Sequence, residues 1–263
     1  MSDVIEKYVK DVDWIREKLL RMDDMIRPIM GIGAWDDAAC VEFNGRLVAS
    51  TDGPYAKRLV MRSALIHAAG DVVVKGAKPM FALDNLIGSR ADVGEMLDSL
   101  GRQAEYMRIP ILGGNTFIDE ESEPLSCVTV IGKLVTDEPI RDSGAKKDDA
   151  IVLIGEPIWG KQEERLPKAK TLFDTMLEAV EKIKFTSAKD VTKGGLTAVV
   201  YEMEKKSGRR FKINDDIPYH RTRNLDNFIV TLNEYEYVTL AQICSQHKCK
   251  LTRIGTVGLK IQQ

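Results

Sequence analysis

The segment 187–196 combines the residue types that bind phosphate groups. It reads Ser-Ala-Lys-Asp-Val-Thr-Lys-Gly-Gly-Leu, so Asp190, Thr192, Gly194 and Gly195 precede an apolar stretch that is expected to be helical. The N-terminus of a helix presents backbone N–H groups and a partial positive charge, and both stabilise a phosphate. A carboxylate beside them could hold the cation that accompanies the phosphate. The segment therefore predicts a site for a phosphate and its metal ion.

Four upstream segments also carry acids, amides or glycines where a strand or a helix is expected to end. They are 33–39 with Asp36 and Asp37, 51–53 with Asp52, 69–72 with Asp71, and 113–116 with Gly113, Gly114, Asn115 and Thr116. Each alone is typical of an ordinary turn, because turns favour Asp, Asn and Gly. Together they offer the oxygen ligands that Mg²⁺ shares with water and phosphate. If three of the acids converge, each pair about 5 Å apart repels by roughly 3 kcal/mol at an effective dielectric constant near 20, so a cation must neutralise them or some must stay protonated.

The hydrophobic pattern predicts the elements that would position these residues. Helices are expected over 3–21, 61–75, 93–107, 172–183, 196–203 and 237–246, and strands over 39–43, 46–51, 80–87, 109–112, 125–134, 150–154, 228–231 and 251–257. The polar segment 136–149 is the expected linker. Because strands and helices mix in both halves, the sequence predicts an α+β protein with two α/β-type domains, 1–143 and 144–263.

The composition is that of an ordinary soluble globular protein. The chain has 263 residues, 44% of them hydrophobic and 30% charged, with a net charge of −2. Such a charge creates no global field that would recruit nucleic acid or an anionic membrane. No apolar run approaches the roughly 20 residues of a membrane helix, and the first residues do not resemble a secretion signal. We therefore expect a cytoplasmic protein without nucleic-acid or membrane partners.

The four cysteines are few and widely spread. They are Cys40, Cys127, Cys244 and Cys249. His247 lies between the last two, but a zinc site would need a second ligand pair of similar density. Reduced thiols are the favoured interpretation.

The order of the motifs resembles an ATP-dependent superfamily. That superfamily contains aminoimidazole ribonucleotide (AIR) synthetase, thiamine-monophosphate kinase, selenophosphate synthetase and a hydrogenase-maturation dehydratase. The matching segments, in family order, are 31–33, 36–39, 51–52, 70–72, 76–79, 110–116, 126–132, 144–149, 151–155, 190–196 and 254–257. They span most of the chain from residue 31 to residue 257.

The resemblance implies a fold, a chemistry and a set of site residues. The N-terminal domain would form a barrel with a second copy, giving a homodimer, and the C-terminal domain would be a sheet with packed helices. ATP and Mg²⁺ would be the cofactors, and the γ-phosphoryl group would pass to a small substrate, a step that depends mainly on positioning and charge neutralisation. The implied metal ligands are Asp36, Asp37, Asp52 and Asp71, and the implied catalytic acids are Asp52, Asp71 and Asp190. The candidate ATP-binding residues are Lys57, Gly113, Gly114, Asn115, Thr116, Thr192, Gly194 and Gly195.

Departures from the family pattern keep an alternative open. Ala34 and Trp35 are inserted before the paired acids, and Asn115 stands where an acid or histidine is common. The second domain is shorter than usual, and no terminal cysteine follows Lys260. The rival interpretation is a catalytically weak or inactive relative that acts as a nucleotide-binding sensor or assembly subunit. An unrelated α/β scaffold is a third interpretation, and the substrate stays open.

Four further features have ordinary and functional interpretations. Lys57 and Arg58 could contact phosphates or be solvated loop charges. His67 lies on an Ala-rich helix, where a core or interface role is favoured over that of a base. The basic segment 205–223 could meet a phosphorylated substrate, although a solvated face is the default. Trp159 could shape a pocket or pack between domains.

Overall fold

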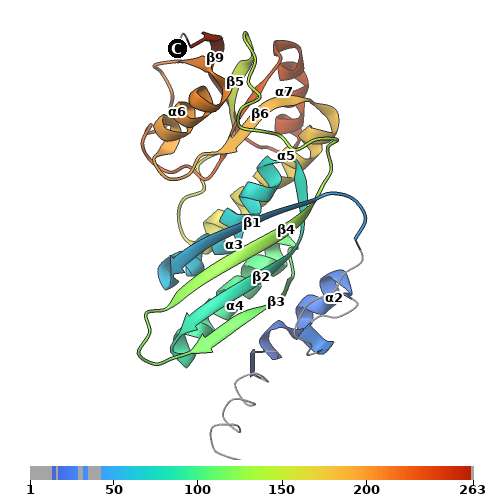
Figure 1. Ribbon diagram of the computed structural model, residues 1–263, viewed down its shortest axis with the longest axis vertical. Coiled ribbons are helices and arrows are strands. Elements are labelled where there is room, and N and C mark those ends of the chain that lie inside the picture. The colour runs from blue at the N-terminus through green and yellow to red at the C-terminus, as the bar shows by residue number, and fades with distance from the viewer. Residues whose placement is uncertain (1–13, 16, 29–31, 35–42, 262–263) are drawn as a thin grey trace, which may run out of the picture. The chain divides into compact units, whose positions relative to one another are not determined.

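The computed structural model describes residues 14, 15, 17–28, 32–34 and 43–261, which fall into two compact units (Figure 1). Unit 1 comprises Met1–Ala68 and Pro79–Gly132, and unit 2 comprises Ala69–Lys78 and Lys133–Gln263. Each unit has its own sheet with helices, so the predicted two-domain α+β class is confirmed. The predicted boundary between residues 143 and 144 stays a prediction.

The sheet of unit 1 has the strand order β1-β4-β2-β3. Its strands are β1 (Leu47–Ala56), β2 (Ala77–Gly88), β3 (Ile111–Ile118) and β4 (Leu125–Leu134), and its helices are α3 (Lys57–Val74) and α4 (Arg90–Met107). Both helices lie on one face of the sheet (Figure 1). Along β4, buried residues such as Val128 and Val130 alternate with half-buried ones such as Thr129 and Ile131. This period of two gives the sheet one covered face and one face that no described helix covers.

A buried glutamine holds α3 against α4. The dihedral angles of Ser63 (φ −166°, ψ 25°) break the helical run inside α3, which interrupts the hydrogen-bond ladder there. The amide of Gln103 donates to the carbonyl of Val60 at 2.8 Å and accepts from the N–H of Leu65 at 3.1 Å. The backbone groups beside the break therefore stay paired, as buried polar groups must.

Short helical turns precede the first sheet. They are η1 (Leu20–Met22), α2 (Asp23–Ile26) and η2 (Ile32–Ala34). The carboxylate of Asp23 accepts from the N–H groups of Ile32 and Gly33 at 2.8 and 2.7 Å, which ties two of these turns together. Most of the predicted helix 3–21, the predicted strand 39–43 and the pair Asp36-Asp37 lie outside the described residues.

Unit 2 contains an antiparallel sheet with the strand order β6-β8-β5-β9-β7. Its strands are β5 (Ala150–Ile154), β6 (Phe185–Asp190), β7 (Arg209–Ile213), β8 (Phe228–Leu232) and β9 (Leu251–Lys260), and its helices are α5 (Gln162–Lys182), α6 (Gly195–Ser207), η3 (Glu234–Glu236) and α7 (Tyr237–Gln246).

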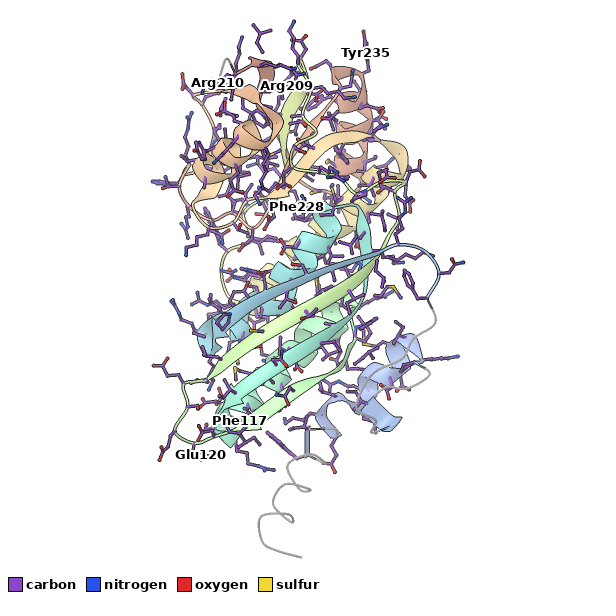
Figure 2. All side chains as sticks on the ribbon, in the orientation of Figure 1. Phe117, Glu120, Arg209, Arg210, Phe228 and Tyr235 are labelled. Atoms are coloured by element: carbon purple, nitrogen blue, oxygen red, sulfur yellow. The ribbon has the colours of Figure 1, made fainter. Side chains whose placement is uncertain are left out.

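The central strands of this sheet are covered on both faces. Every residue of β5 and β8 is buried. Ile229 belongs to the core cluster that contains Val199 of α6, whereas the ring of Phe228 stacks on Phe173 of α5 with centroids 6.0 Å apart (Figure 2). Because neighbouring residues of a strand point to opposite faces, α6 and α5 cover different faces. All residues of the two apolar runs that predicted these strands are therefore buried in the packed core of unit 2.

Three segments that were expected to be turns lie inside regular elements. Residues 51–53 belong to β1 and 113–116 to β3, so those turn predictions are wrong, whereas 69–72 lie in α3, inside the predicted helix 61–75. Packing does not require the glycine at position 70, because a Cβ there would meet the rings of Phe228 and Phe173 at the ordinary contact distances of 3.8 and 3.9 Å. Among the described residues, no helix is both long and apolar enough to cross a membrane.

Candidate functional site

In unit 1, the pair Asp84–Gly114 joins β2 to β3. The two strands run parallel, and the register places Asp84 opposite Gly114 directly after an irregularity in the pairing. A Cβ at position 114 would lie 1.7 Å from the carbonyl oxygen of Asp84 and 2.3 Å from its Oδ1. Only glycine permits this approach, so the Gly113-Gly114 pair serves close packing against an acid rather than a turn.

Asp84 is buried and carries an oxygen without a hydrogen-bond partner. Its side chain is enclosed, with 4% of the residue exposed, and Oδ2 accepts no hydrogen bond. Burial raises the pKa of Asp84 to about 7, because a charged carboxylate is poorly stabilised away from water. A buried, unpartnered carboxylate that titrates near neutrality can bind a cation or carry a proton. Asp84 is not among the site residues predicted from the sequence, although an acid inside the apolar stretch 80–87 is a signal of a buried functional carboxylate.

Asp52 lies on β1 and belongs to the covered face of the same sheet. The neighbouring Thr51 shares a hydrogen bond of 2.7 Å between its Oγ1 and that of Thr129, which lies on the uncovered face of β4. Because side chains alternate along a strand, Asp52 points to the other face, the one to which Asp84 belongs. The strand β4 lies between the strands that carry these two acids.

Lys57, a candidate phosphate contact, is held by two carboxylates of α4. Its Nζ lies 2.7 Å from Asp92 and 2.7 Å from Glu95. The hydrogen bonds to Asp92 and Glu95 raise the pKa of Lys57. Because its charge is already neutralised, we leave Lys57 out of the phosphate-binding set proposed below.

In unit 2, Asp71 and Asp190 lie close together. Asp71 belongs to the last turns of α3, and Asp190 is the final residue of β6. Burial and then the negative charge of Asp71 raise the pKa of Asp190 to about 6. Two acids that are far apart in the sequence therefore lie close enough to interact electrostatically.

Lysines surround the acid pair and organise its neighbourhood. Lys189 Nζ lies 3.9 Å from Asp190, and its charge, like that of Lys75, lowers the pKa of Asp190 without offsetting the upward shift. Lys75 donates to the carbonyl of Ala188 at 2.7 Å and pairs with Asp142. These bonds fix α3 against the end of β6, so the acid pair is a rigid feature of unit 2.

Asp142 is the anion that balances these lysines. It pairs with Lys206 at 2.6 Å and lies 4.0 Å from Lys189. Burial opposes its ionisation, yet the bonds to Lys206 and Lys75 hold the pKa of Asp142 below its usual range. The lysines are thus partly neutralised within the protein, and the raised pKa of Asp190 shows that their charges do not offset its burial and the charge of Asp71.

The predicted phosphate segment forms the start of α6. The helix begins at Gly195 after Gly194, a residue with φ 87° that provides no side-chain cap. A Cβ on Gly195 would lie 2.6 Å from the carbonyl oxygen of Arg223. The N–H of Thr197 already donates to the carbonyl of Arg221 at 3.0 Å. The N–H of Gly195 donates to the carbonyl of Thr192 at 2.9 Å as well, so the helix start is as expected but two of its first N–H groups are already satisfied within the chain.

A metal site built from three acids is not observed in the described part of the chain. There, no three His, Cys, Asp or Glu side chains gather closely enough to hold a metal ion. The predicted ligands Asp36 and Asp37 lie outside that part. The pair Asp71–Asp190 still suits Mg²⁺, because this ion usually takes only one or two carboxylates and completes its shell with water and phosphate.

Three other candidates have structural roles. His67 contacts Ser63 at 3.0 Å and packs edge-on against Tyr55. Trp159 donates from its ring to the carbonyl of Asn224 at 2.7 Å and packs against the core of unit 2. The ring of His247 pairs with Glu178 at 2.6 Å and not with a metal cluster.

Two family models match the chain. The model described as AIR synthase related protein, N-terminal domain, matches residues 35–134, and the corresponding C-terminal domain matches residues 136–259. An uncharacterized protein of Methanocaldococcus jannaschii is 35% identical over 256 residues, which are 95% of this chain and 85% of that protein. Phosphoribosylformylglycinamidine synthase subunit PurL of Methanosarcina mazei is 27% identical over 59% of this chain, which spans only 26% of PurL.

Solved structures share the fold. Thiamine-monophosphate kinase from Stenotrophomonas maltophilia superimposes with a TM-score of 0.71 at 20% identity, over 94% of this chain and 92% of that one. The hydrogenase maturation protein HypE in complex with ATP gives a TM-score of 0.70 at 19% identity, over 91% and 83% of the two chains. At these identities, the likeness concerns the fold alone.

Proposed function

Since the chain belongs to the AIR synthase related family, we propose that it is an ATP- and Mg²⁺-dependent enzyme that activates a small substrate by phosphoryl transfer. The relatives named above include a kinase and a protein solved with ATP. Another relative, from Dechloromonas aromatica, is named selenide, water dikinase. The family is therefore one of ATP-using enzymes, and the particular acceptor of the phosphoryl group is open.

The convergence of Asp71 and Asp190 is the observation that carries this proposal. Two carboxylates in one partly desolvated place repel each other, which is why the pKa of Asp190 is raised. A divalent cation removes that repulsion and, when bound, neutralises phosphate charge during transfer. The two acids would hold the ion, and the segment with Thr192, Gly194 and Gly195 would face the phosphate with the Thr192 hydroxyl as a donor, since the N–H of Gly195 already donates to the Thr192 carbonyl at 2.9 Å.

Unit 1 carries further candidate ligands, which are proposed from their own geometry and from the motif order. Asp52 and the buried Asp84 supply carboxylates, and the segment 113–116 brings Gly113, Gly114, Asn115 and Thr116 beside Asp84. The orphaned Oδ2 of Asp84 fits a site for a cation or a proton. Asp36 and Asp37 stay proposed metal ligands on the strength of the motif order.

The uncovered face of the unit 1 sheet supports the proposed homodimer. Half-buried Cys127, Thr129 and Ile131 line β4 on that face, and Phe117 at the end of β3 is 57% exposed (Figure 2). Apolar side chains in such numbers on one sheet face are typical of a surface that another chain covers. A second copy is the partner that the family resemblance implies.

The experiment is thermal unfolding with and without Mg-ATP, followed by an ATP-consumption assay. Ligand at about 100 times its dissociation constant adds about 2.7 kcal/mol to the free energy of unfolding. We expect stabilisation by Mg-ATP that is larger than that by ATP with a chelator. The absence of any shift at saturating nucleotide, with the protein folded, would contradict the proposal.

The second candidate function is a nucleotide-binding sensor or assembly subunit without turnover. Asn115, which contributes no charge where an acid is common, favours it. Stabilisation by Mg-ATP without consumption of ATP, across small acceptors such as hydroxymethyl compounds, carboxylates and selenide, would favour this candidate over the enzyme.

A further inference from the structure

The C-terminal end of α7 brings two thiols together. The helix ends at Lys248, which has a left-handed backbone conformation (φ 55°). The N–H of Lys248 donates to the carbonyl of Ser245 at 3.1 Å, and the N–H of Cys249 donates to the carbonyl of Cys244 at 2.8 Å. These two bonds define a Schellman motif, in which the side chains of the bonded outer pair usually make an apolar contact. Here that pair is Cys244 and Cys249, so the motif brings their side chains to the same end of the helix.

The two thiols differ in access. Cys244 is 1% exposed and packs inside unit 2. Cys249 lines a pocket of about 140 Å³, together with Gly155, Glu156, Pro167, Lys168, Thr171, Lys248 and Lys250. Cys249 is 8% exposed but lines the pocket, so a reagent approaches the thiol pair from the side of Cys249.

The pocket is cationic, which favours a thiolate and an anionic reagent. Three of its residues are lysines, and its one acid, Glu156, lies 3.4 Å from Lys168. The hydrogen bond from Cys244 lowers the pKa of Cys249, assisted by Thr175 and His247, although burial opposes the shift. The same hydrogen bond, with burial, raises the pKa of Cys244. Reactive cysteines occur in electropositive, partly accessible surroundings of this kind.

We propose that Cys249 and Cys244 form a redox-active dithiol, in which Cys249 attacks a small anionic disulfide and Cys244 resolves the product. In the first step, the Cys249 thiolate bonds to one sulfur of the disulfide RSSR, the S–S bond breaks, and RS⁻ leaves and takes up a proton. In the second step, Cys244 loses its proton and bonds to the Cys249 sulfur, which releases the second RSH. Two thiols are oxidised to one protein disulfide, and one RSSR is reduced to two RSH.

The test uses the full chain with Cys40→Ser and Cys127→Ser, treated with the dianionic reagent 5,5′-dithiobis(2-nitrobenzoate). We expect two coloured thiolates per chain, no retained reagent, and a cross-linked peptide pair containing Cys244 and Cys249 after digestion and mass spectrometry. In the same background, Cys244→Ser should stop at a mixed disulfide on Cys249, and Cys249→Ser should leave Cys244 unreacted in the folded protein. Peptide mapping of the Cys40→Ser, Cys127→Ser protein tests the proposal even if the Cys244→Ser and Cys249→Ser variants do not fold.

A charge variant tests the role of the pocket. Lys168→Gln with Lys250→Gln should slow the reaction with the dianionic reagent several-fold, and should leave the reaction with neutral bis(2-hydroxyethyl) disulfide nearly unchanged. Retention of the reagent on Cys249 in the parent while Cys244 still accepts an alkylating agent would overturn the proposal. An equal reaction of Cys244 in the Cys249→Ser variant would overturn it too.

Discussion

Asp71 of α3 lies close enough to Asp190 at the end of β6 for its charge to raise the pKa of the Asp190 carboxyl. This relationship links two sequence motifs that belong to different secondary structure elements of unit 2. It also makes the ionisation of one acid depend on the other, which gives the site a measurable signature without any ligand.

Replacing Asp71 should lower the pKa of Asp190. The Asp71→Asn change removes the like charge, so the carboxyl of Asp190 ionises more easily and its pKa falls from about 6 toward the ordinary 3.8. Burial remains, so the fall is partial. Carboxyl-carbon NMR titration of the parent and the variant measures it. The exposed change Asp215→Asn is the control, and an unshifted Asp190 titration in Asp71→Asn would contradict the proximity of the pair.

The raised pKa of Asp190 also predicts a pH dependence of stability. Between pH 3.8 and about 6, the folded state holds a proton on Asp190 that the unfolded state has released. The free energy of unfolding therefore falls as the pH rises through this window, by up to roughly 3 kcal/mol for a shift of about two pKa units. Urea unfolding at several pH values, without metal, should show a smaller fall in Asp190→Asn than in the parent.

Asp84 should also make the free energy of unfolding fall as the pH rises, over a wider pH range than Asp190 does. Its pKa is raised from 3.8 to about 7 by burial, so the protein loses stability as the pH rises from about 4 to 7. Asp84→Asn keeps the shape of the side chain and removes the charge, so the variant should be more stable than the parent above pH 7 in the absence of metal. A variant that is equally stable at pH 5 and less stable at pH 8 would show that Asp84 is not a desolvated acid.

Gly114→Ala tests the contact with Asp84. The added Cβ would meet the backbone oxygen of Asp84 at 1.7 Å, so β2 and β3 must move apart. We expect a loss of about 1–3 kcal/mol in the free energy of unfolding, as for other overpacked sites. Gly70→Ala is the matched control, because its Cβ makes only ordinary contacts at 3.8 Å or more and its helical site favours alanine. Equal stability of the two variants would contradict the close approach.

Gln103→Met should destabilise the break in α3. The change keeps the length of the side chain but removes the partner of the buried Leu65 N–H and one of two donors to the Val60 carbonyl, which Ser99 Oγ still reaches at 3.2 Å. Leaving such groups unpaired costs about 1–3 kcal/mol. The control is Gln246→Met, at an exposed position at the end of α7, and chemical denaturation compares the two.

The strongly patterned elements could be predicted from the sequence, and those that depend on tertiary packing could not. The range of α7 is as predicted, and the apolar run of β5 marks a buried strand. By contrast, the segment 113–116 resembles a turn by its glycines, whereas the close contact with Asp84 explains Gly114. The strand β7 was missed because only Phe211 within it is buried, so its charged residues hid the alternation.

The candidate site shows the same difference between residues that sequence motifs indicate and residues whose role depends on tertiary packing. The family resemblance pointed to Asp71 and Asp190 as site residues, whereas their electrostatic interaction with each other is visible only in the fold. The role of Asp84 depends on burial and on the lack of a partner, which become visible only once β2 and β3 are paired.

The connectivity of the second sheet has a consequence for biosynthesis. The strand β5 finds its partners only in β8 and β9, both of which are translated much later. A ribosome therefore exposes the apolar stretch Ala150–Ile154 before any neighbour exists for it, and such unpaired strands aggregate readily. The pairing of β5 is therefore a late and non-local step in folding, which follows the synthesis of β9, the last strand of the sheet in chain order.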